Sequence, residues 1–379
     1  MKVQIVVTHL LGTGHLARAV ALAAAFVQAG HTVLVVSGGM PVPRLKTTGI
    51  DFHQLPSLRS DGVDFTNLLD SSDGPASNAL FLERKKQLVD TTLSFSPDVL
   101  ITELFPFGRR ILKDEFLTFL DAAKAMSRPP KILASIRDIL APPSKPKKAL
   151  FAEQTIMSHY DAVLVHSDPD LTPLELSWPV SEELRRMLRY TGFVAPRTAL
   201  PHPTQFGQSE VIVSAGGGSV GMELFECAGL AASIDRDRQW RILVGGQGAV
   251  DRIADLKAGA PENLIVEPVR PDFRQMLHHA AASVSFCGYN TAQDLLQTSC
   301  SAVFVPFDAG NEVEQGLRSE ALSHLAGFEV LRSAELTATA LLEKVNQAIA
   351  SPRRAAAPSA NGAQQTVEIV DELVSEVAR

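Results

Sequence analysis

The amino-acid sequence predicts an α/β protein built from two doubly wound domains, each with a parallel sheet between layers of helices. Its length of 379 residues exceeds what one hydrophobic core normally supports. Short β-rich runs alternate with Ala- and Leu-rich helical segments along most of the chain. The alternation starts again after a proline-rich stretch at residues 195–208, which we interpret as an interdomain linker.

The first half of the chain opens with a βαβ unit. Val3–Thr8 predicts a buried strand, His15–Ala29 a helix that ends at Gly30, and His31–Ser37 a second strand. The polar, turn-rich segment at 57–79 is expected to form a loop. A first domain is therefore expected over residues 1–195, and its later strands are expected at 99–102, 131–136 and 162–166.

The same pattern recurs in the second half. Glu210–Ser214 predicts a strand, the glycines at 216–218 a turn, and Val220–Ala232 a helix. We expect a second domain over residues 209–354, and then a final helix at about 364–379 after an Ala-rich stretch. The remaining strands of this domain are expected at 240–244, 264–267, 282–286 and 302–305.

Composition narrows the class of protein. A hydrophobic fraction of 45% and a charged fraction of 20% are ordinary for a soluble globular protein. Widely spaced Cys227, Cys287 and Cys300 argue against a disulfide scaffold or a multi-cysteine zinc site and fit a reducing cytoplasm. With no leader-like or membrane-spanning segment in the sequence, we expect a cytoplasmic protein.

The charge of the chain indicates which kinds of binding partner are plausible. A net charge of −7 and an aromatic content of 6% argue against a nucleic-acid polymer as partner. Local basic runs stand at 84–86, 109–110 and 145–148. They are either solvated helix faces and a loop, or a face that meets an anionic acceptor or a membrane surface.

Glycine turns stand between a strand and a helix at three places, where free backbone N–H groups can bind an anion. The first, Gly12-Thr13-Gly14-His15, lacks the third glycine of the dinucleotide fingerprint, and the chain has no P-loop sequence. The second is Gly216-Gly217-Gly218-Ser219, and the third is Cys287-Gly288-Tyr289-Asn290-Thr291. For each, a purely structural turn is the alternative to ligand contact.

Polar side chains near these turns are candidate site residues. His15 at a helix start would be neutral and able to accept a proton, with packing or capping as the alternative. Glu103, at the end of a predicted strand, is the second candidate base. Asn290 and Thr291 can cap a helix and donate to a phosphate oxygen. Asp294, one turn later, can accept two ribose hydroxyls or lie solvated.

Other polar residues have weaker support. A loop after the strand at 302–305 carries side chains that can bind sugar hydroxyls or simply face solvent, namely Asn311, Glu314 and Gln315. Cys287 has no His or Asp close in sequence, which disfavours a nucleophile. His278 and His279 have no companion ligands at metal spacing, so we predict no metal.

Motifs in both halves resemble the GT-B glycosyltransferases, notably family 28, which contains the lipid-linked N-acetylglucosaminyltransferase of peptidoglycan synthesis. The stretch Ser285–Leu296 resembles the pattern S/T-R-A-G-x-x-T-x-x-E-L-L, with Gly288 and Thr291 kept and Asp294 in the acidic position. Val305-Pro306-Phe307 with Glu314-Gln315 resembles the loop whose Gln contacts the donor sugar. The turn at 12–15 is similar to the glycine loop that ends in His.

Other segments refine this resemblance. Phe105–Arg110 and Leu188–Val194 resemble a branch of predicted bacterial glycosyltransferases. The sequence departs from the family pattern where Phe286 replaces Arg, where Asp294 replaces Glu, and where Val220 replaces a Gln.

The resemblance implies two Rossmann-like domains that face each other across a cleft, with the acceptor bound by the N-terminal domain and a nucleotide sugar by the C-terminal domain. The final helix is expected to cross back onto the N-terminal domain. His15 would be the base beside an acceptor loop of Gly12, Thr13 and Gly14. The diphosphate would be held by Gly217, Gly218, Ser219, Gly288, Asn290 and Thr291. Asp294 would bind the ribose, and Arg270 would lie near the nucleobase. The donor sugar would be bound by Asn311, Glu314 and Gln315.

The function implied is transfer of a sugar, GlcNAc or a related hexose, from a UDP-sugar to an acceptor hydroxyl by an inverting enzyme that needs no metal or other cofactor. The acceptor would be lipid-linked or a small molecule, with at most peripheral contact to the inner face of the membrane. Two alternatives remain open. They are a hydrolysing UDP-sugar 2-epimerase and a non-catalytic nucleotide-sugar-binding protein.

Overall fold

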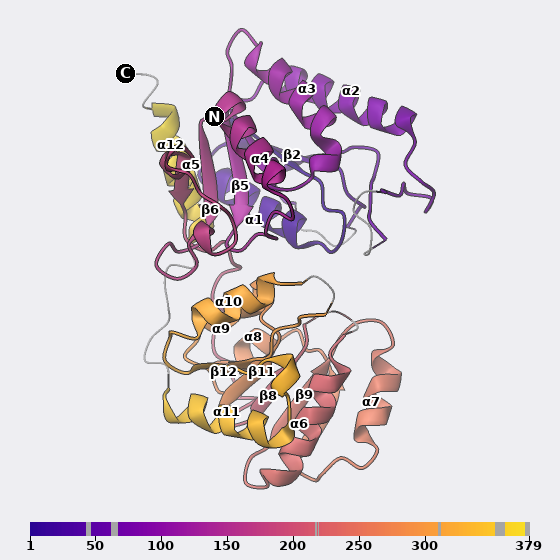
Figure 1. Ribbon diagram of the computed structural model, residues 1–379, viewed down its shortest axis with the longest axis vertical. Coiled ribbons are helices and arrows are strands. Elements are labelled where there is room, and N and C mark those ends of the chain that lie inside the picture. The colour runs from indigo at the N-terminus through magenta and orange to yellow at the C-terminus, as the bar shows by residue number, and fades with distance from the viewer. Residues whose placement is uncertain are drawn as a thin grey trace. The chain divides into compact units, whose positions relative to one another are not determined.

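The computed structural model describes residues 1–42, 47–61, 67–216, 218, 220–309, 312–352 and 361–375. Contacts divide the chain into two compact units. The first comprises Met1–Pro196 together with Asn361–Arg379, and the second comprises Arg197–Ala360 (Figure 1). Within the described residues, no helix is long and apolar enough to cross a membrane.

The first unit is a seven-stranded parallel sheet in the order β3-β2-β1-β4-β5-β6-β7. Chain order therefore reverses between β1 and β4, as in doubly wound folds. The strands are β1 Lys2–Val7, β2 Thr32–Ser37, β3 Asp51–Gln54, β4 Val99–Glu103, β5 Lys131–Arg137, β6 Ala162–His166 and β7 Leu188–Tyr190. The helices are α1 Gly14–Gln28, α2 Asn78–Phe95, α3 Lys113–Lys124, α4 Pro146–His159, α5 Glu182–Met187 and α12 Gly362–Ser375.

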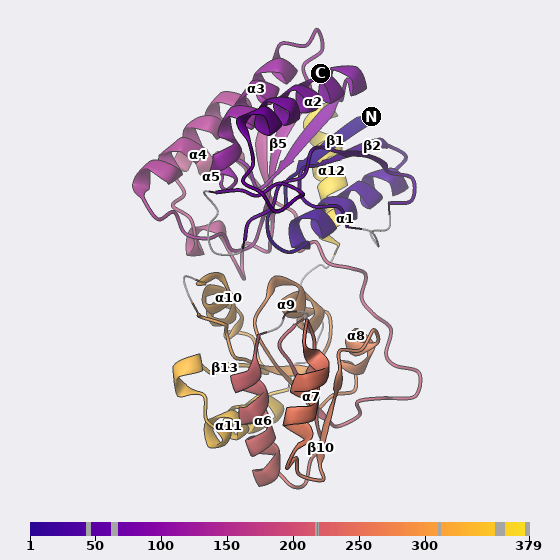
Figure 2. The ribbon, with the colours of Figure 1, turned by 90° about the vertical axis from the view of Figure 1, so that its right-hand side faces the viewer.

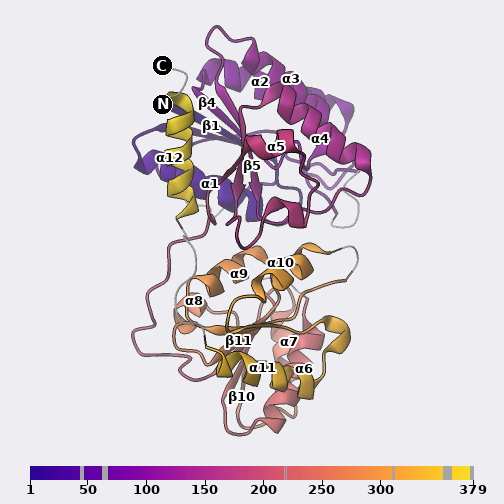
Figure 3. The same ribbon diagram turned by 60° about the vertical axis from the view of Figure 1, so that its left-hand side comes forward.

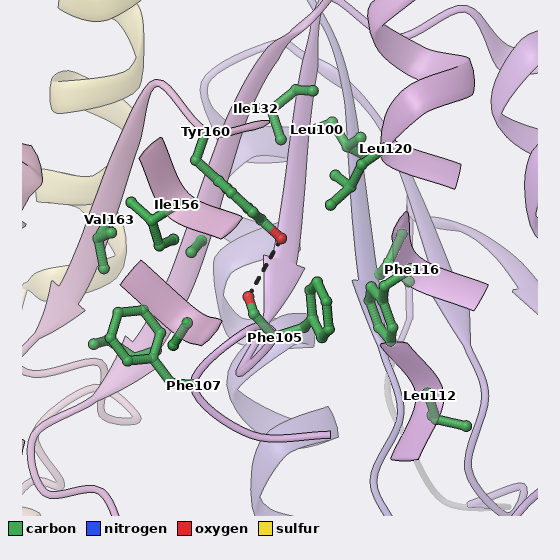
Figure 4. Packing of buried hydrophobic residues seen from close by; sticks show 14 of the residues in the cluster. Leu100, Phe105, Phe107, Leu112, Phe116, Leu120, Ile132, Ile156, Tyr160 and Val163 are labelled. Atoms are coloured by element: carbon green, nitrogen blue, oxygen red, sulfur yellow. Dashed lines mark hydrogen bonds between the residues drawn. The ribbon is translucent and has the colours of Figure 1, made fainter. Parts of the chain in front are cut away.

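Alternate residues of these strands enter separate cores on the two faces of the sheet, as the two-residue period requires. Helices α2, α3 and α4 cover one face and α1 and α12 cover the other (Figures 2 and 3). In the first core, Phe105 stacks on Phe116 with ring centroids 4.4 Å apart. The hydroxyl of Tyr160 donates to the carbonyl oxygen of Phe105 at 3.4 Å (Figure 4).

The C-terminal helix belongs to the first unit. Val367 and Val370 of α12 lie in the same apolar cluster as Leu22 and Phe26 of α1. Gly362 donates its N–H to the carbonyl oxygen of Phe193 at 3.1 Å, which fixes the start of the helix against the end of the first unit. The sequence at 362–375 thus completes a core that begins at the N-terminus.

The second unit is a six-stranded parallel sheet in the order β10-β9-β8-β11-β12-β13, with its reversal between β8 and β11. The strands are β8 Val211–Ser214, β9 Trp240–Val244, β10 Leu264–Pro268, β11 Ala282–Ser285, β12 Ser301–Phe304 and β13 Phe328–Val330. The helices are α6 Met222–Ile234, α7 Ala249–Lys257, α8 Phe273–Met276, α9 Tyr289–Leu296, α10 Glu314–Leu322 and α11 Ala338–Ala350. Helices α6 and α11 enclose its main core against one face of the sheet.

The segment predicted as a linker lies against the second unit. The carbonyl oxygens of Ala199 and His202 face Nε2 of His278 and His279, at 2.7 and 3.1 Å. Phe206 lies between the guanidinium groups of Arg241 and Arg270, whose carbons are 4.6 and 4.3 Å from its ring centroid. These contacts anchor the proline-rich stretch to the second unit.

Candidate active site

Doubly wound sheets bind ligands at the carboxyl ends of their strands, at the point where chain order reverses. In the first unit this point lies between β1 and β4, which hydrogen-bond in parallel from Val3 opposite Val99 onward. The loop after β1 contains the first glycine turn, and β4 ends at Glu103. Both candidate bases therefore flank the reversal point of the first sheet.

The first glycine turn leaves the start of α1 open. Gly12 has φ +64°, a left-handed conformation that favours glycine, and a Cβ on Gly12 or Gly14 would meet no atom within 4 Å. Thr13 occupies the N-cap position of α1 and makes no side-chain capping bond. The backbone N–H groups of the first turn are thus uncapped by Thr13 and border open space.

His15 and Glu103 form a direct pair. Nδ1 of His15 lies 2.8 Å from Oε1 of Glu103, although the two residues are 88 positions apart. The His15 side chain is 15% exposed and the Glu103 side chain only 1%. Glu103 therefore cannot reach a ligand in solvent, and its place is behind the imidazole.

Arg18, one turn along α1, keeps Glu103 ionised. Its guanidinium pairs with Oε1 of Glu103, and its Nε lies 3.5 Å from Oε2. Burial by itself would raise the pKa of Glu103, but the charge of Arg18 and the contact with His15 hold that pKa well below its usual range. An ionised carboxylate only accepts hydrogen bonds, so Nδ1 of His15 carries the proton that lies between them. Nη2 of Arg18 also lies 3.1 Å from Nδ1, but a guanidinium only donates, so this contact is not a hydrogen bond in that tautomer.

His15 is neutral at physiological pH. Burial lowers the pKa of its imidazole to about 4, and the raising effects of Glu103 are too small to offset this. With Nδ1 protonated, Nε2 has its lone pair free, and no described residue is hydrogen-bonded to that nitrogen. The arrangement is that of a general base held in one tautomer by a carboxylate. Glu103, which the sequence offered as a rival base, orients His15.

Two further polar residues, which were not predicted from the sequence, lie beside Glu103. Ser135, in β5, donates to Oε2 of Glu103 at 2.6 Å, and His166, at the end of β6, has Nε2 2.9 Å from the Ser135 oxygen. The available signal is a polar residue near the carboxyl end of each adjacent parallel strand. Which of these side chains meet depends on strand order, which the sequence does not give.

In the second unit, the second and third glycine turns flank the corresponding reversal point between β8 and β11. Ser214 of β8 pairs in register with Ser285 of β11, so the two loops leave the sheet side by side. Gly217 and Ser219 lie outside the described residues. Gly218 has open space on one side, because a Cβ there would meet only Val220, at 3.8 Å.

Two glycines near this point have opposite roles. Gly221 has φ +104°, and a Cβ on it would lie 2.4 Å from the Cβ of Ala215 and 3.4 Å from the ring of Phe286. Gly288 has φ −64° and would meet nothing within 4 Å. Gly221 is thus required by the close approach of the two loops, whereas Gly288 borders open space.

Helix capping differs from the expectation. Gly288 is the N-cap residue of α9 and makes no side-chain bond, while Asn290 and Thr291 already lie in the first turn of the helix. The prediction that Asn290 and Thr291 cap a helix is therefore wrong, because the helix begins one residue earlier, at Tyr289. Because Gly288 has no side chain, the N-cap position of α9 offers no side-chain acceptor to the first turn of the helix.

Asp294 and Arg270 both have protein partners. Asp294 accepts from Nε of Arg274 at 2.6 Å, and burial raises the pKa of its carboxyl against the opposing effect of Arg274. Arg270 donates through Nε and one Nη to both oxygens of Asp272, each at 2.8 Å, while it stacks on Phe206. Arg270 thus fastens the stretch before β8 to the second unit.

The polar loop after β12 is partly described, and it is shorter than predicted, because Glu314 and Gln315 form the start of α10. Oε1 of Gln315 accepts from the N–H of Phe307 at 3.2 Å, which leaves its amide NH₂ as a donor. Glu312, which the sequence analysis did not single out, accepts from the N–H of Glu314 at 2.7 Å and so caps α10. Asn311 lies outside the described residues. Among the described residues, no group of three or more His, Cys, Asp or Glu side chains could hold a metal ion.

Arg318 is a further residue that the sequence analysis missed. It is 2% exposed and donates to the carbonyl oxygen of Cys287 at 2.9 Å. Its guanidinium lies 5.8 Å from the ring centroid of Tyr289. A buried cation therefore supports the third glycine turn from behind.

Comparisons with known proteins agree with this geometry. The chain superposes on MurG of Acinetobacter baumannii with a TM-score of 0.64 at 17% identity, covering 98% of this chain and 100% of that one. It superposes on the glycosyltransferase VinC, solved with dTDP, with a TM-score of 0.65 at 15% identity, covering 99% and 100%. At these identities the likeness concerns the fold, which is the GT-B fold of glycosyltransferases, as the sequence predicted.

Sequence comparison defines the family. Residues 212–373 match the model described as the glycosyltransferase family 28 C-terminal domain. The curated relatives include the UDP-N-acetylglucosamine–N-acetylmuramyl-(pentapeptide) pyrophosphoryl-undecaprenol N-acetylglucosamine transferase of Agrobacterium fabrum, 28% identical over 46% of this chain and 49% of that protein. The enzyme of the same name from Brucella anthropi is 31% identical over 36% and 38%. These matches span half or less of each relative's length. Residues 212–373 thus match a family 28 C-terminal domain, a span that takes in most of the second unit and most of α12, and the recognition made from the sequence is confirmed.

Proposed function

We propose that this protein is an inverting, metal-independent glycosyltransferase that moves GlcNAc or a related hexose from a UDP-sugar to an acceptor hydroxyl. Nε2 of His15 would take the proton of the hydroxyl while its oxygen attacks the anomeric carbon. The bond from that carbon to the diphosphate would break, and UDP would leave with the electron pair. One displacement of this kind inverts the anomeric configuration.

The observation that carries the proposal is the His15–Glu103 pair. A neutral imidazole with Nδ1 held at 2.8 Å by a carboxylate presents Nε2 as a proton acceptor. Its lowered pKa, about 4, keeps it unprotonated across the physiological range. A histidine that served only to pack or cap would not need a buried, ionised carboxylate behind it.

The loops of the second unit support the donor assignment. The uncapped start of α9 at Gly288 and the open space beside Gly218 suit a diphosphate, which backbone N–H groups and helix dipoles stabilise as charge develops. This is the chemical basis of the proposed metal independence. We assign Gly217, Gly218, Ser219, Gly288, Asn290 and Thr291 to the diphosphate and Asp294 to the ribose. Asn311, Glu314 and Gln315 are assigned to the sugar, with Arg270 near the nucleobase.

The acceptor is proposed only by class. The names of the curated relatives include a pyrophosphoryl-undecaprenol acceptor. We therefore propose an acceptor that is lipid-linked, or a small molecule with a free hydroxyl, and a cytoplasmic protein with at most peripheral contact to the membrane.

A panel of UDP-, GDP- and dTDP-sugars tests the function. Transfer predicts that UDP is released from UDP-sugars and that release is stimulated by acceptor. Formation of an epimer, with UDP released and no acceptor needed, would support a 2-epimerase. Thermal stabilisation by a nucleotide sugar with no turnover would support a binding protein. Each of the last two results would refute glycosyl transfer.

The role of His15 is tested separately. His15→Ala should lower kcat by roughly 10²- to 10⁴-fold, since general-base catalysis is lost, and should leave the dissociation constant for UDP unchanged. His159→Ala is the matched control, because His159 ends α4 at the opposite edge of the sheet and bonds Asp121 there. An unaltered rate in His15→Ala would remove His15 from the mechanism.

A further inference from the structure

Behind Glu103 lies a chain of buried polar groups that the proposed reaction does not use. Ser135 and His166 are 0% exposed and Thr191 is 1% exposed. The Ser135 oxygen lies 2.6 Å from Oε2 of Glu103 and 2.9 Å from Nε2 of His166. Nδ1 of His166 lies 2.8 Å from the Thr191 hydroxyl. The chain thus runs from β4 across β5 and β6 to the residue after β7.

The direction of the protons in this chain follows from the ionised carboxylate at its Glu103 end. Ionised Glu103 can only accept, so the single proton of Ser135 points to it. The Ser135 oxygen must then accept from Nε2–H of His166. Burial lowers the pKa of His166 to about 3, so its imidazole is neutral and Nδ1 is left as an acceptor for the Thr191 hydroxyl. Ser135 and His166 therefore donate toward Glu103, while the Thr191 hydroxyl lies 2.8 Å from two acceptors, Nδ1 of His166 and the carbonyl oxygen of Gly192.

We propose that Ser135, His166 and Thr191 are positioning residues, a relay that fixes the Glu103 carboxylate so that Oε1 faces Nδ1 of His15. The relay acts on the tautomer of His15 and through it on Nε2, the atom that takes the proton. This inference rests on the proposed function for its effect on rate. Its structural content, the direction of the protons, stands independently.

The contacts on Glu103 explain why the relay is needed. Arg18 pairs closely with Oε1 and reaches Oε2 only at 3.5 Å, so Arg18 by itself leaves Oε2 weakly held. Ser135 contacts only Oε2 and His15 only Oε1. Because Glu103 and Ser135 are opposite each other in the β4–β5 register, this division is built into the sheet. Besides Arg18, the charge of Arg109 acts on both Glu103 and His15, and it would not change in the variants below.

The direction of the relay is tested by ¹⁵N NMR of the full chain with ¹⁵N-labelled histidine at pH 7. His15 should show a protonated Nδ1 and a bare Nε2, and His166 the opposite tautomer. These opposite patterns require no substrate and no turnover. A bare Nδ1 in His15 or a protonated Nδ1 in His166 would overturn the inference, whatever the enzyme transfers.

Variants test the effect on rate. Ser135→Ala removes the bond to Oε2 and should lower kcat about 10- to 100-fold, the scale known for the hydrogen-bond partners that orient metal-binding histidines. The His15 signal should become a mixture of tautomers, and KM for the donor should not change. His166→Leu should act in the same direction. His166→Gln, whose amide can donate to Ser135 in place of Nε2–H, should restore most of the rate.

Thr102→Val is the matched control for loss of a buried hydroxyl. Thr102 is 0% exposed and precedes Glu103 in β4. Its hydroxyl bonds the Tyr160 hydroxyl at 2.8 Å and the carbonyl oxygen of Phe105 at 3.0 Å, and not the Glu103 carboxylate. The Thr102→Val variant should be less stable than the wild type but should keep the wild-type tautomer of His15 and the wild-type kcat. If Ser135→Ala folds and keeps both as well, or if His166→Gln is no better than His166→Leu, the relay does not position the base. If all variants and the wild type lack transferase activity but the tautomers are as stated, the proposed function fails and the relay stands.

Discussion

The pKa of His15 is the most direct physical prediction of the site. The structure lowers it from the usual 6.5 to about 4, because the side chain is buried to 15% exposure beside Arg18. A pKa lowered to about 4 corresponds to roughly 3 kcal/mol against the charged form of the imidazole. The unfolded chain binds a proton near pH 6.5 and the folded chain does not. Above pH 6.5 the His15 imidazole therefore does not change the free energy of unfolding. As the pH falls from 6.5 toward 4, it lowers that free energy by up to roughly 3 kcal/mol.

The assay is an NMR titration of the His15 ring between pH 8 and the acid limit of the fold. The midpoint should lie near 4, and kcat/KM should keep its value down to about pH 5 before an acid limb appears. Glu103→Gln gives a test of sign. The hydrogen bond and charge of Glu103 both raise the pKa of His15, so their loss should move the midpoint lower still. A wild-type midpoint near 6.5, or an upward shift in Glu103→Gln, would refute this account of the site.

Other predictions concern packing and the donor. Gly221→Ala should lower stability by about 2–4 kcal/mol, because φ is +104° and a Cβ would lie 2.4 Å from another Cβ. Gly316→Ala, within α10, meets open space and should not lower Tm in calorimetry. Asp294→Ala should weaken UDP binding at least tenfold in titration calorimetry, and undiminished affinity would remove the ribose assignment. Val370→Ala in buried α12 should destabilise the first unit by about 2 kcal/mol. If hydrogen exchange instead rises first in residues 197–352, that packing is wrong.

Much of the fold could be predicted because parallel strands buried on both faces give continuous apolar runs, as in β1, β2 and β4. β3, β7 and β13 were not predicted, and β7 is only the three-residue run Leu188–Tyr190. β3 is the polar edge run Asp51–Gln54, and β13 has only the residues Phe328–Val330, so neither gives such a run. The helix at 364–379 was expected to cross back, and α12 does pack on α1.

The site was only partly accessible to sequence. His15 and Glu103 could each be proposed from a strand or helix end, but their pairing depends on β1 and β4 being neighbours. Arg18 follows His15 by one helical turn. It could not be singled out as a site residue because charged residues are common on helices. Ser135 and His166 lie inside apolar strands, where only strand order shows that their polar atoms meet. Conversely, the sequence suggested that Arg270 lies near the nucleobase, whereas its guanidinium pairs with Asp272 and stacks on Phe206.

The central claim is that the second unit captures a nucleotide diphosphate at uncapped helix starts beside β8 and β11. Hydrogen–deuterium exchange of the full chain with and without UDP tests it most directly. UDP should slow exchange in peptides that cover 214–222 and 286–292 and leave α7 and α11 unaffected. Unchanged exchange in both peptides at saturating UDP, or protection confined to the first unit, would contradict the claim.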